Sequence, residues 1–241
     1  MNEARRPVGR GALYRKFLNA RSPLRLLEKG LHGGLGTGNV GVVLAGHGVG
    51  KTPFLVCVAL DELLRQGRVL HVTLDQTVSH LRAYYDTVFE DLASTTRLED
   101  EVVTHAEVDR CRSIRAYPAH AFTAEKLREA VKVESEAGSR PSLLIVEGLD
   151  FDSLPRADLM QLKALAGELD AEVWLSIACR EERVDGIPAA VRRVEDLVSV
   201  ILALEPAPGA VALRALKDHD TPDVSDLHVA LDPRTLLLTR S

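Results

Sequence analysis

The stretch "VGVVLAGHGVGKTPFLVCVALDELLRQG", residues 40–67, decides how this chain is expected to fold. Its first part, 40–45, is an apolar run that predicts a buried strand, and 53–67 has the pattern of a helix that ends at Gly67. The glycine-rich segment between them, 45–52, opens that helix with a Lys-Thr pair. Backbone N–H groups at such a turn can surround a polyphosphate, because glycines carry no Cβ that would obstruct them.

Apolar runs and helical patterns alternate along the chain as far as residue 178. Strands are expected at 69–74, 114–117, 143–147 and 173–178, and helices from 78 to about 92, at 123–138 and at 154–169. Thr123 is a candidate N-cap of its helix, and Gly138 is a candidate stop. Strands that alternate with helices of this length predict right-handed crossovers and a parallel sheet covered on both faces. The polar segment from about Asp91 to Arg112 fits neither pattern.

The C-terminal part of the chain has a different composition. After residue 197, short apolar runs follow one another with turns of Pro, Gly or Asp between them. Such runs predict antiparallel strands that continue the sheet at one edge. The expected fold class is therefore α/β, with a mostly parallel central sheet flanked by helices and antiparallel C-terminal edge strands.

Charge divides the chain into two parts. The protein has 241 residues and a formal net charge of −5, yet its first 30 residues hold eight Lys and Arg residues against two Glu. The remainder is thus acidic, which argues against a body that follows a nucleic-acid backbone. We interpret residues 1–22 as a basic N-terminal arm and 23–241 as a single domain.

Cysteine usage and hydropathy indicate the compartment. The three cysteines include no C-x-x-C pair, so neither a disulfide framework nor a zinc site is expected. The sequence contains no signal-peptide pattern and no apolar run of membrane length. The expectation is a cytoplasmic protein without a membrane partner.

The glycine-rich turn offers the groups that nucleotide phosphates need. Lys51 can reach the β- and γ-phosphates, Thr52 offers a hydroxyl to Mg²⁺, and Pro53 is tolerated because the first helical turn has no intrahelical partner for its N–H groups. The candidate nucleotide-binding residues are Gly46, His47, Gly48, Val49, Gly50, Lys51, Thr52 and Pro53. Ala45 stands where the strict pattern G-x-x-x-x-G-K-[ST] has its first glycine, and an ordinary glycine-rich turn is the alternative interpretation.

A carboxylate at the end of a nearby strand is needed to support the metal ion through water. The run "SLLIVEGLD" supplies Glu147 at that place, and Asp150 and Asp152 are nearby alternatives. Thr52 and Glu147 are therefore the candidate Mg²⁺ residues, while a solvated acidic loop after the strand is the competing interpretation. His71 is interpreted as an ordinary sheet residue, because no metal-binding spacing connects it to another histidine.

Several segments together resemble one family, the RecA-fold P-loop ATPases, and within it most closely the KaiC-type proteins and next the replicative helicases of the DnaB type. The stretch 22–52, with "GGL" ahead of the loop strand, is similar to the family's opening segment, and alanine at the first loop position is familiar from the helicase branch. "VLHVTLDQT" (69–77) resembles the family's second strand. "ACREERVDGIPAAVRRVEDLVSVILAL" (178–204) is similar to the KaiC-type stretch after the fourth core strand, and "ALKDHD" (215–220) resembles its K-x-R element.

The resemblance implies a RecA-like domain that binds ATP with Mg²⁺ and assembles with copies of itself in a ring or filament. In the family, the second strand ends in a glutamate that polarises the attacking water, and the corresponding positions here are Asp75 and Gln76. The K-x-R element of relatives contacts nucleotide on the neighbouring subunit. Lys217 matches its lysine, while His219 stands where arginine is expected.

These departures lower the expected rate of hydrolysis. Asp75 is one methylene shorter than glutamate, and about 1 Å of misplacement can cost ~100-fold in rate. Gln76 cannot act as a base, and His219 lacks the permanent charge and bidentate donors of arginine. Asp75, Lys51 and Glu147 remain the candidate catalytic residues. The expected function is ATP binding with slow or assembly-dependent hydrolysis, in which the nucleotide state controls oligomerisation or the binding of a protein partner.

Two other functions stay open. One is a non-catalytic scaffold subunit that binds nucleotide for stability, and the other is a DNA-dependent ATPase that acts as a helicase or recombination accessory. The loops that face nucleic acid in relatives lack a cationic track and stacking aromatics here, so a nucleic-acid partner is weakly supported. The basic arm could bind nucleic acid, or it could dock on an adjacent protomer through Leu13, Phe17, Leu24 and Leu27.

Overall fold

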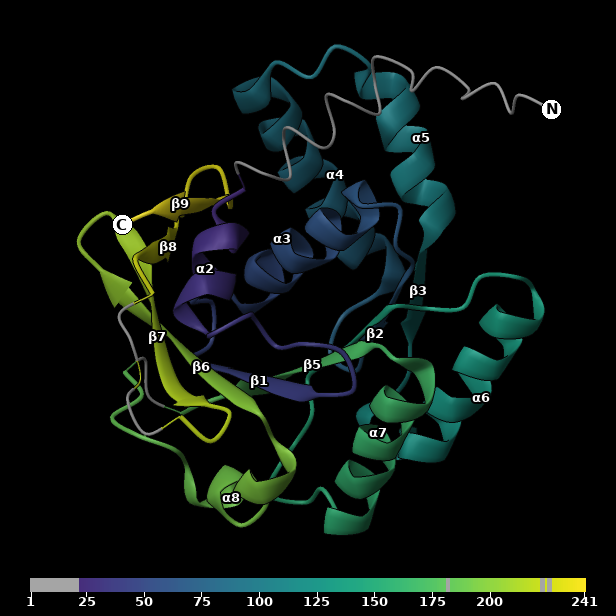
Figure 1. The fold of residues 1–241 in the computed structure, drawn as a ribbon, viewed down its shortest axis with the longest axis vertical. Coiled ribbons are helices and arrows are strands. Elements are labelled where there is room, and N and C mark those ends of the chain that lie inside the picture. Colours follow the sequence, from purple (N-terminus) through teal and green to yellow (C-terminus); the bar gives the residue numbers. More distant parts are fainter. Residues whose placement is uncertain (1–21, 181–182, 222–223, 225–226) are drawn as a thin grey trace, which may run out of the picture.

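The computed structural model describes residues 22–180, 183–221, 224 and 227–241. Within this part of the chain the protein is an α/β structure built on one nine-stranded mixed sheet (Figure 1). The strand order across the sheet is β3-β2-β4-β5-β1-β6-β7-β8-β9. In chain order the strands are β1 (Val40–Ala45), β2 (Val69–Thr73), β3 (Arg112–Ala116), β4 (Leu143–Glu147), β5 (Glu172–Ala178), β6 (Val200–Ala207), β7 (Ala210–Asp218), β8 (Val229–Leu231) and β9 (Leu238–Arg240).

The type of strand pairing changes once across the sheet. Pairs from β3 through to β6 are parallel, and pairs from β6 to β9 are antiparallel. The predicted parallel centre and antiparallel C-terminal edge are therefore confirmed. Strand β1 lies between β5 and β6, with Ala45 beside Ala178 and Leu44 beside Ala203. Because parallel strands end at the same edge, the segments that follow β1, β2, β4 and β5 emerge together there.

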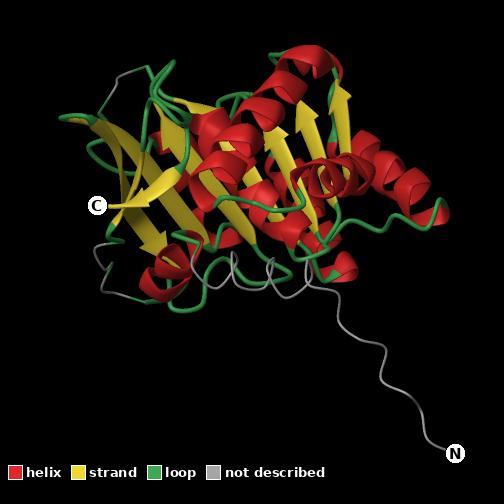
Figure 2. Ribbon diagram, turned by 90° about the horizontal axis from the view of Figure 1, so that it is seen from above, coloured by secondary structure: helices red, strands yellow, loops and turns green. Residues whose placement is uncertain are grey.

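Helices cover both faces of the sheet (Figure 2). On one face, side chains such as Val43 pack against α2 (Leu24–Gly30), α3 (Lys51–Leu64), α4 (Val78–Thr96) and α5 (Glu101–Cys111). On the other, side chains such as Val42 pack against α6 (Ala124–Glu136), α7 (Arg156–Leu169) and α8 (Ala189–Arg192). Short 3₁₀ helices occupy Ala119–Ala121 and Glu195–Leu197. Neighbouring strand residues point to opposite faces, so both must be apolar. Among the described residues, no helix combines the length and apolarity needed to span a bilayer.

The segment that fitted neither pattern in the sequence is largely helical. Helix α4 continues to Thr96, and α5 occupies 101–111. The buried residues of α5 are Thr104 and Val108, one turn apart, while Val102 is 83% exposed. A helix with so narrow a buried stripe has little apolar periodicity, which explains why pattern reading did not detect it.

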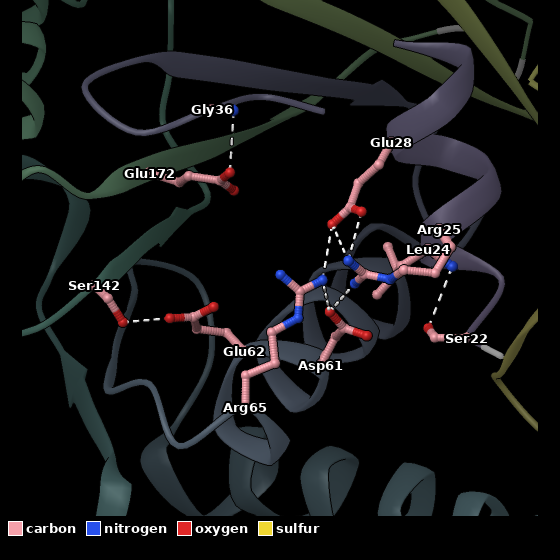
Figure 3. A network of polar contacts seen from close by, with 10 residues as sticks. All are labelled: Ser22, Leu24, Arg25, Glu28, Gly36, Asp61, Glu62, Arg65, Ser142 and Glu172. Carbon is pink, nitrogen blue, oxygen red and sulfur yellow. Dashed lines mark hydrogen bonds and ion pairs between the residues drawn. The ribbon is translucent and has the colours of Figure 1, made fainter. Parts of the chain in front are cut away.

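Ion pairs fasten α2 to the C-terminal end of α3, whereas the glycine-rich turn lies at the N-terminal end of that helix. Arg25 of α2 pairs with Glu28 and with Asp61 of α3, and Arg65 contacts the same two carboxylates (Figure 3). Arg25, counted with the basic N-terminal residues in the sequence, therefore has its charge compensated inside the domain.

The apolar residues proposed for docking on another protomer divide into two groups. Leu13 and Phe17 lie outside the described residues. Leu24 and Leu27 are buried in the core of their own chain, where α2 packs on α3. For these two leucines the docking interpretation is wrong, because their side chains already stabilise the domain that carries them.

Candidate functional site

The glycine-rich segment forms a tight turn between the carboxyl end of β1 and the start of α3. Gly48 and Gly50 have φ angles of +73° and +122°, which side-chain-bearing residues rarely adopt. Ala45, in contrast, is the fully buried last residue of β1 and has no positive φ. The backbone at position 45 therefore does not require the glycine of the strict pattern.

Lys51 lies folded back across this turn. Its Nζ donates hydrogen bonds to the carbonyl oxygens of Ala45, at 3.1 Å, and Gly46, at 2.9 Å. Burial lowers the pKa of Lys51, while the nearby carboxylates of Asp75 and Glu147 oppose that shift. An ammonium group at the N-terminus of a 14-residue helix gives this edge of the sheet a positive potential suited to an anion.

The two candidate Mg²⁺ residues meet. Thr52 Oγ1 donates a hydrogen bond of 2.7 Å to Glu147 Oε2, and both side chains are buried. Glu147 ends β4, which β5 separates from β1, so the contact joins elements that are not neighbours in the sheet. A hydroxyl and a carboxylate oxygen are hard ligands of the kind that Mg²⁺ prefers, so these residues fit that ion. Asp150 is exposed, and its Oδ1 accepts instead from the backbone of Asp152.

Asp75 and Gln76, which lie shortly after β2, point in different directions. Gln76 Nε2 donates to Thr52 Oγ1 at 3.0 Å, while its Oε1 is buried and has no hydrogen-bond partner among the described residues. Asp75 is exposed, and its Oδ1 accepts from Thr73 Oγ1 at 3.1 Å. The backbone at Gly148 lies close to Asp75, since a Cβ on Gly148 would be 2.9 Å from Asp75 Cγ. Gln76, which the sequence marked only as unable to act as a base, is thus the one that reaches Thr52.

A buried histidine, interpreted from the sequence as an ordinary sheet residue, also belongs to the site. His71 of β2 has its Nε2 2.9 Å from Glu147 Oε1 and its Nδ1 2.9 Å from the hydroxyl of Tyr85 on α4. The sequence did not predict this contact, in which His71 holds the second oxygen of the carboxylate that contacts Thr52. The sequence shows only a polar residue inside the apolar run 69–73. The contact of His71 with Glu147 depends on the register of β2 against β4.

A cavity of about 340 Å³ opens beside the turn. Its polar side consists of residues 47–53 with Asp75 and Gln76. Its apolar side comes from distant parts of the chain, namely Tyr84, Val211, Leu231, Pro233 and Leu236. Small-molecule sites span roughly 300–1,000 Å³. The cavity therefore suits a ligand that combines an anionic group with an apolar part, and the C-terminal contribution to it was not foreseen from the sequence.

Lys217 and His219 lie at the opposite end of the sheet from the turn. Strand β7 runs antiparallel to β6, so its last residues pair with the beginning of β6. Lys217 Nζ donates to the carbonyl oxygen of Glu195 at 2.6 Å. The ring nitrogens of His219 lie 2.8 Å from Asp218 Oδ1 and 3.1 Å from the carbonyl oxygen of Leu35. Within one chain these residues do not join the site, and their contact with a neighbouring subunit's nucleotide stays a prediction.

No protein-family model matches this chain, and no curated protein matches it either. The function of the site is therefore inferred from its geometry: a glycine-rich turn, a folded-back lysine and the Thr52–Glu147 contact at one edge of a mixed sheet.

Proposed function

We propose that the protein is an ATP-binding P-loop ATPase with a RecA-like fold, similar to KaiC-type proteins, whose nucleotide state controls oligomerisation or the binding of a partner. The observation that carries this proposal is the hydrogen bond between Thr52 and Glu147, which lies beside Lys51. A hydroxyl at the start of the helix after a glycine-rich turn, bonded to a carboxylate at the end of a non-adjacent strand, is the pair required for Mg²⁺ bound to a polyphosphate. The parallel centre of the sheet supports the same fold assignment.

Each side chain at the turn then has a distinct role. The backbone of residues 46–52 and the ammonium group of Lys51 bind the phosphates. Thr52 and Glu147 are the residues that would hold Mg²⁺, Glu147 through water, and the ion would supply charge neutralisation for the phosphates. The apolar side of the cavity accommodates the base of the nucleotide.

The geometry supports slow or assembly-dependent hydrolysis. Asp75 is the carboxylate available to orient an attacking water, yet one of its oxygens already accepts from Thr73. An arginine supplied in trans can contribute ~10³–10⁵ in rate, and His219 lacks that guanidinium. A nucleotide-holding scaffold is the second candidate, because the side chain that reaches Thr52 is the amide of Gln76, which cannot act as a base.

The decisive experiment measures ATP binding and phosphate release by the purified protein across a series of protein concentrations. We expect Mg²⁺-dependent binding, with release that rises more steeply than protein concentration. Lys51→Ala should abolish both, while Lys132→Ala, a matched change at an exposed side chain, should leave both unchanged. Asp75→Glu in the same assay should raise turnover if the shortened carboxylate limits it.

The possible results separate the candidate functions. An unmodified protein that fails to bind ATP would remove the central claim and leave the turn as architecture alone. Tight ATP binding without Lys51-dependent phosphate release would favour the scaffold function. Stimulation by single-stranded DNA would favour the DNA-dependent ATPase.

A further inference from the structure

A chain of buried polar contacts leads from the proposed metal site into the core. One carboxylate oxygen of Glu147 accepts from Thr52, and the other lies 2.9 Å from His71 Nε2. The second ring nitrogen of His71 lies 2.9 Å from the hydroxyl of Tyr85. His71 and Tyr85 are 0% exposed and Glu147 is 2% exposed, so these contacts form without competition from bulk water.

The donors and acceptors along this chain can be assigned. A carboxylate only accepts, so His71 Nε2 carries the proton that it shares with Glu147. In the neutral imidazole Nδ1 is then the acceptor, and the phenol of Tyr85 is its donor. Burial raises the pKa of Tyr85, which keeps that phenol protonated. Arg112 lies over the Tyr85 ring, 4.5 Å from its centroid, and helps to keep the ring in place.

The consequence concerns the orientation of Glu147. A glutamate side chain has several rotatable bonds, and at a strand end its carboxylate could turn toward the core, the solvent or Thr52. The contact with His71 removes this freedom, because it turns one oxygen inward and leaves the other toward Thr52. Partners behind a metal-supporting group typically set its orientation and hence the metal affinity.

We propose that His71, itself bonded to Tyr85, is a positioning residue that orients Glu147 so that a single carboxylate oxygen faces Thr52 and the Mg²⁺ site. This inference rests on the proposed function and deepens it, because it assigns control of Mg²⁺ affinity to a side chain that lies behind Glu147. The alternative is a purely structural role, in which the His71 contacts serve only to satisfy buried polar atoms.

The variants separate these two roles. His71→Leu removes both hydrogen bonds and keeps an apolar side chain in the core. His71→Gln restores a donor for Glu147, and Tyr85→Phe deletes the phenol oxygen alone. Val72→Ala is the matched control, because this neighbour on β2 is fully buried but points to the opposite face of the sheet.

Binding of ATP is then titrated with MgCl₂, and separately measured in EDTA. His71→Leu should raise the Mg²⁺ concentration needed for half-maximal binding by about 10- to 100-fold, without changing the affinity measured in EDTA. His71→Gln should recover most of this loss, and Tyr85→Phe should cost about 2- to 10-fold. Val72→Ala should keep the Mg²⁺ dependence of the unmodified protein. In addition, ¹⁵N NMR of the nucleotide-free protein should show His71 protonated at Nε2 and not at Nδ1.

Each contrary result overturns the inference. An unchanged Mg²⁺ dependence in His71→Leu would do so, as would an equal loss of binding in MgCl₂ and EDTA, which indicates a structural role. If His71→Leu does not fold, the Tyr85→Phe variant tests the proposal instead. An unshifted Mg²⁺ dependence of ATP binding in that variant would then contradict the positioning role. Failure of the proposed function is seen separately, as an unmodified protein that binds no ATP under either condition, and the inference then falls with it.

Discussion

Replacement of Gly50 by alanine should destabilise the protein more than the same change at Gly48, two positions earlier in the same turn. Gly50 has a φ of +122°, and an added Cβ would lie 2.6 Å from Leu231 Cδ2. Gly48 has a φ of +73°, and a Cβ there would have nothing within 4 Å. Both changes add one methyl group, so their difference isolates backbone conformation and the contact with β8.

The size of the difference follows from the geometry. The left-handed conformation at Gly48 costs alanine ~1–2 kcal/mol. The conformation at Gly50 is sparsely populated and costs ~1–3 kcal/mol, and forcing a methyl into a filled space costs a further ~1–3 kcal/mol. Carbon atoms pack best at ~3.5–4.0 Å, so Leu231 would have to move away. Gly50→Ala should thus lower the free energy of unfolding by about 2–6 kcal/mol, and Gly48→Ala by about 1–2 kcal/mol.

Urea denaturation measures both losses, and a double-mutant cycle assigns the steric part. Leu231→Ala alone should cost about 2–5 kcal/mol, as other large-to-small core changes do. Gly50→Ala combined with Leu231→Ala should cost less than the two single changes together, because the smaller side chain makes room for the new Cβ. Equal losses at Gly48 and Gly50, or strict additivity in the cycle, would refute the reasoning that β8 packs directly on the turn.

Two further changes test the fold away from the site. Burial raises the pKa of Asp61 to about 6, although Arg25 lies beside it, so its contribution to stability is fully present below its ordinary value of 3.8 and is lost as pH rises through about 6. Asp61→Asn removes this pH dependence. Between about pH 4 and pH 7 the unmodified protein should lose about 2–3 kcal/mol of its free energy of unfolding relative to the variant. A difference in free energy of unfolding between the two proteins that stays constant with pH would contradict this prediction. Thr123→Ala removes the side chain that caps α6 by accepting from the Lys126 N–H, and should cost about 1 kcal/mol in urea denaturation. An unchanged midpoint would show that this cap does not stabilise the helix.

Local sequence patterns predicted much of the framework. Strand β1, the turn and helix α3 were expected from one continuous stretch, because apolar runs, glycines and a helix pattern report on neighbouring residues. The same holds for the cap at Thr123 and for the change to antiparallel strands after residue 197. Glu147 was preferred to Asp150 as the Mg²⁺-supporting carboxylate because it ends a strand, and it is the residue that contacts Thr52. Its role in holding Mg²⁺ stays a prediction.

Other parts of the molecule had no local signature. Helix α5 buries only a narrow stripe, so its sequence resembles that of a polar loop. The packing of Leu231 on Gly50 joins residues far apart in the chain, and nothing near either residue announces it. The contact of Gln76 with Thr52 likewise joins two segments that are distant in the sequence, and it leaves Asp75 facing solvent.

The sequence by itself determined that a glycine-rich turn follows a buried strand, because backbone conformation there is set by glycines and by the first turn of a helix. Only the tertiary structure decided which groups surround that turn. His71 contacts Glu147 because β2 and β4 pair in one particular register, and Tyr85 reaches His71 because α4 packs on that face of the sheet. Such contacts depend on how distant segments share a core, and a register shift of one residue would turn His71 to the opposite face.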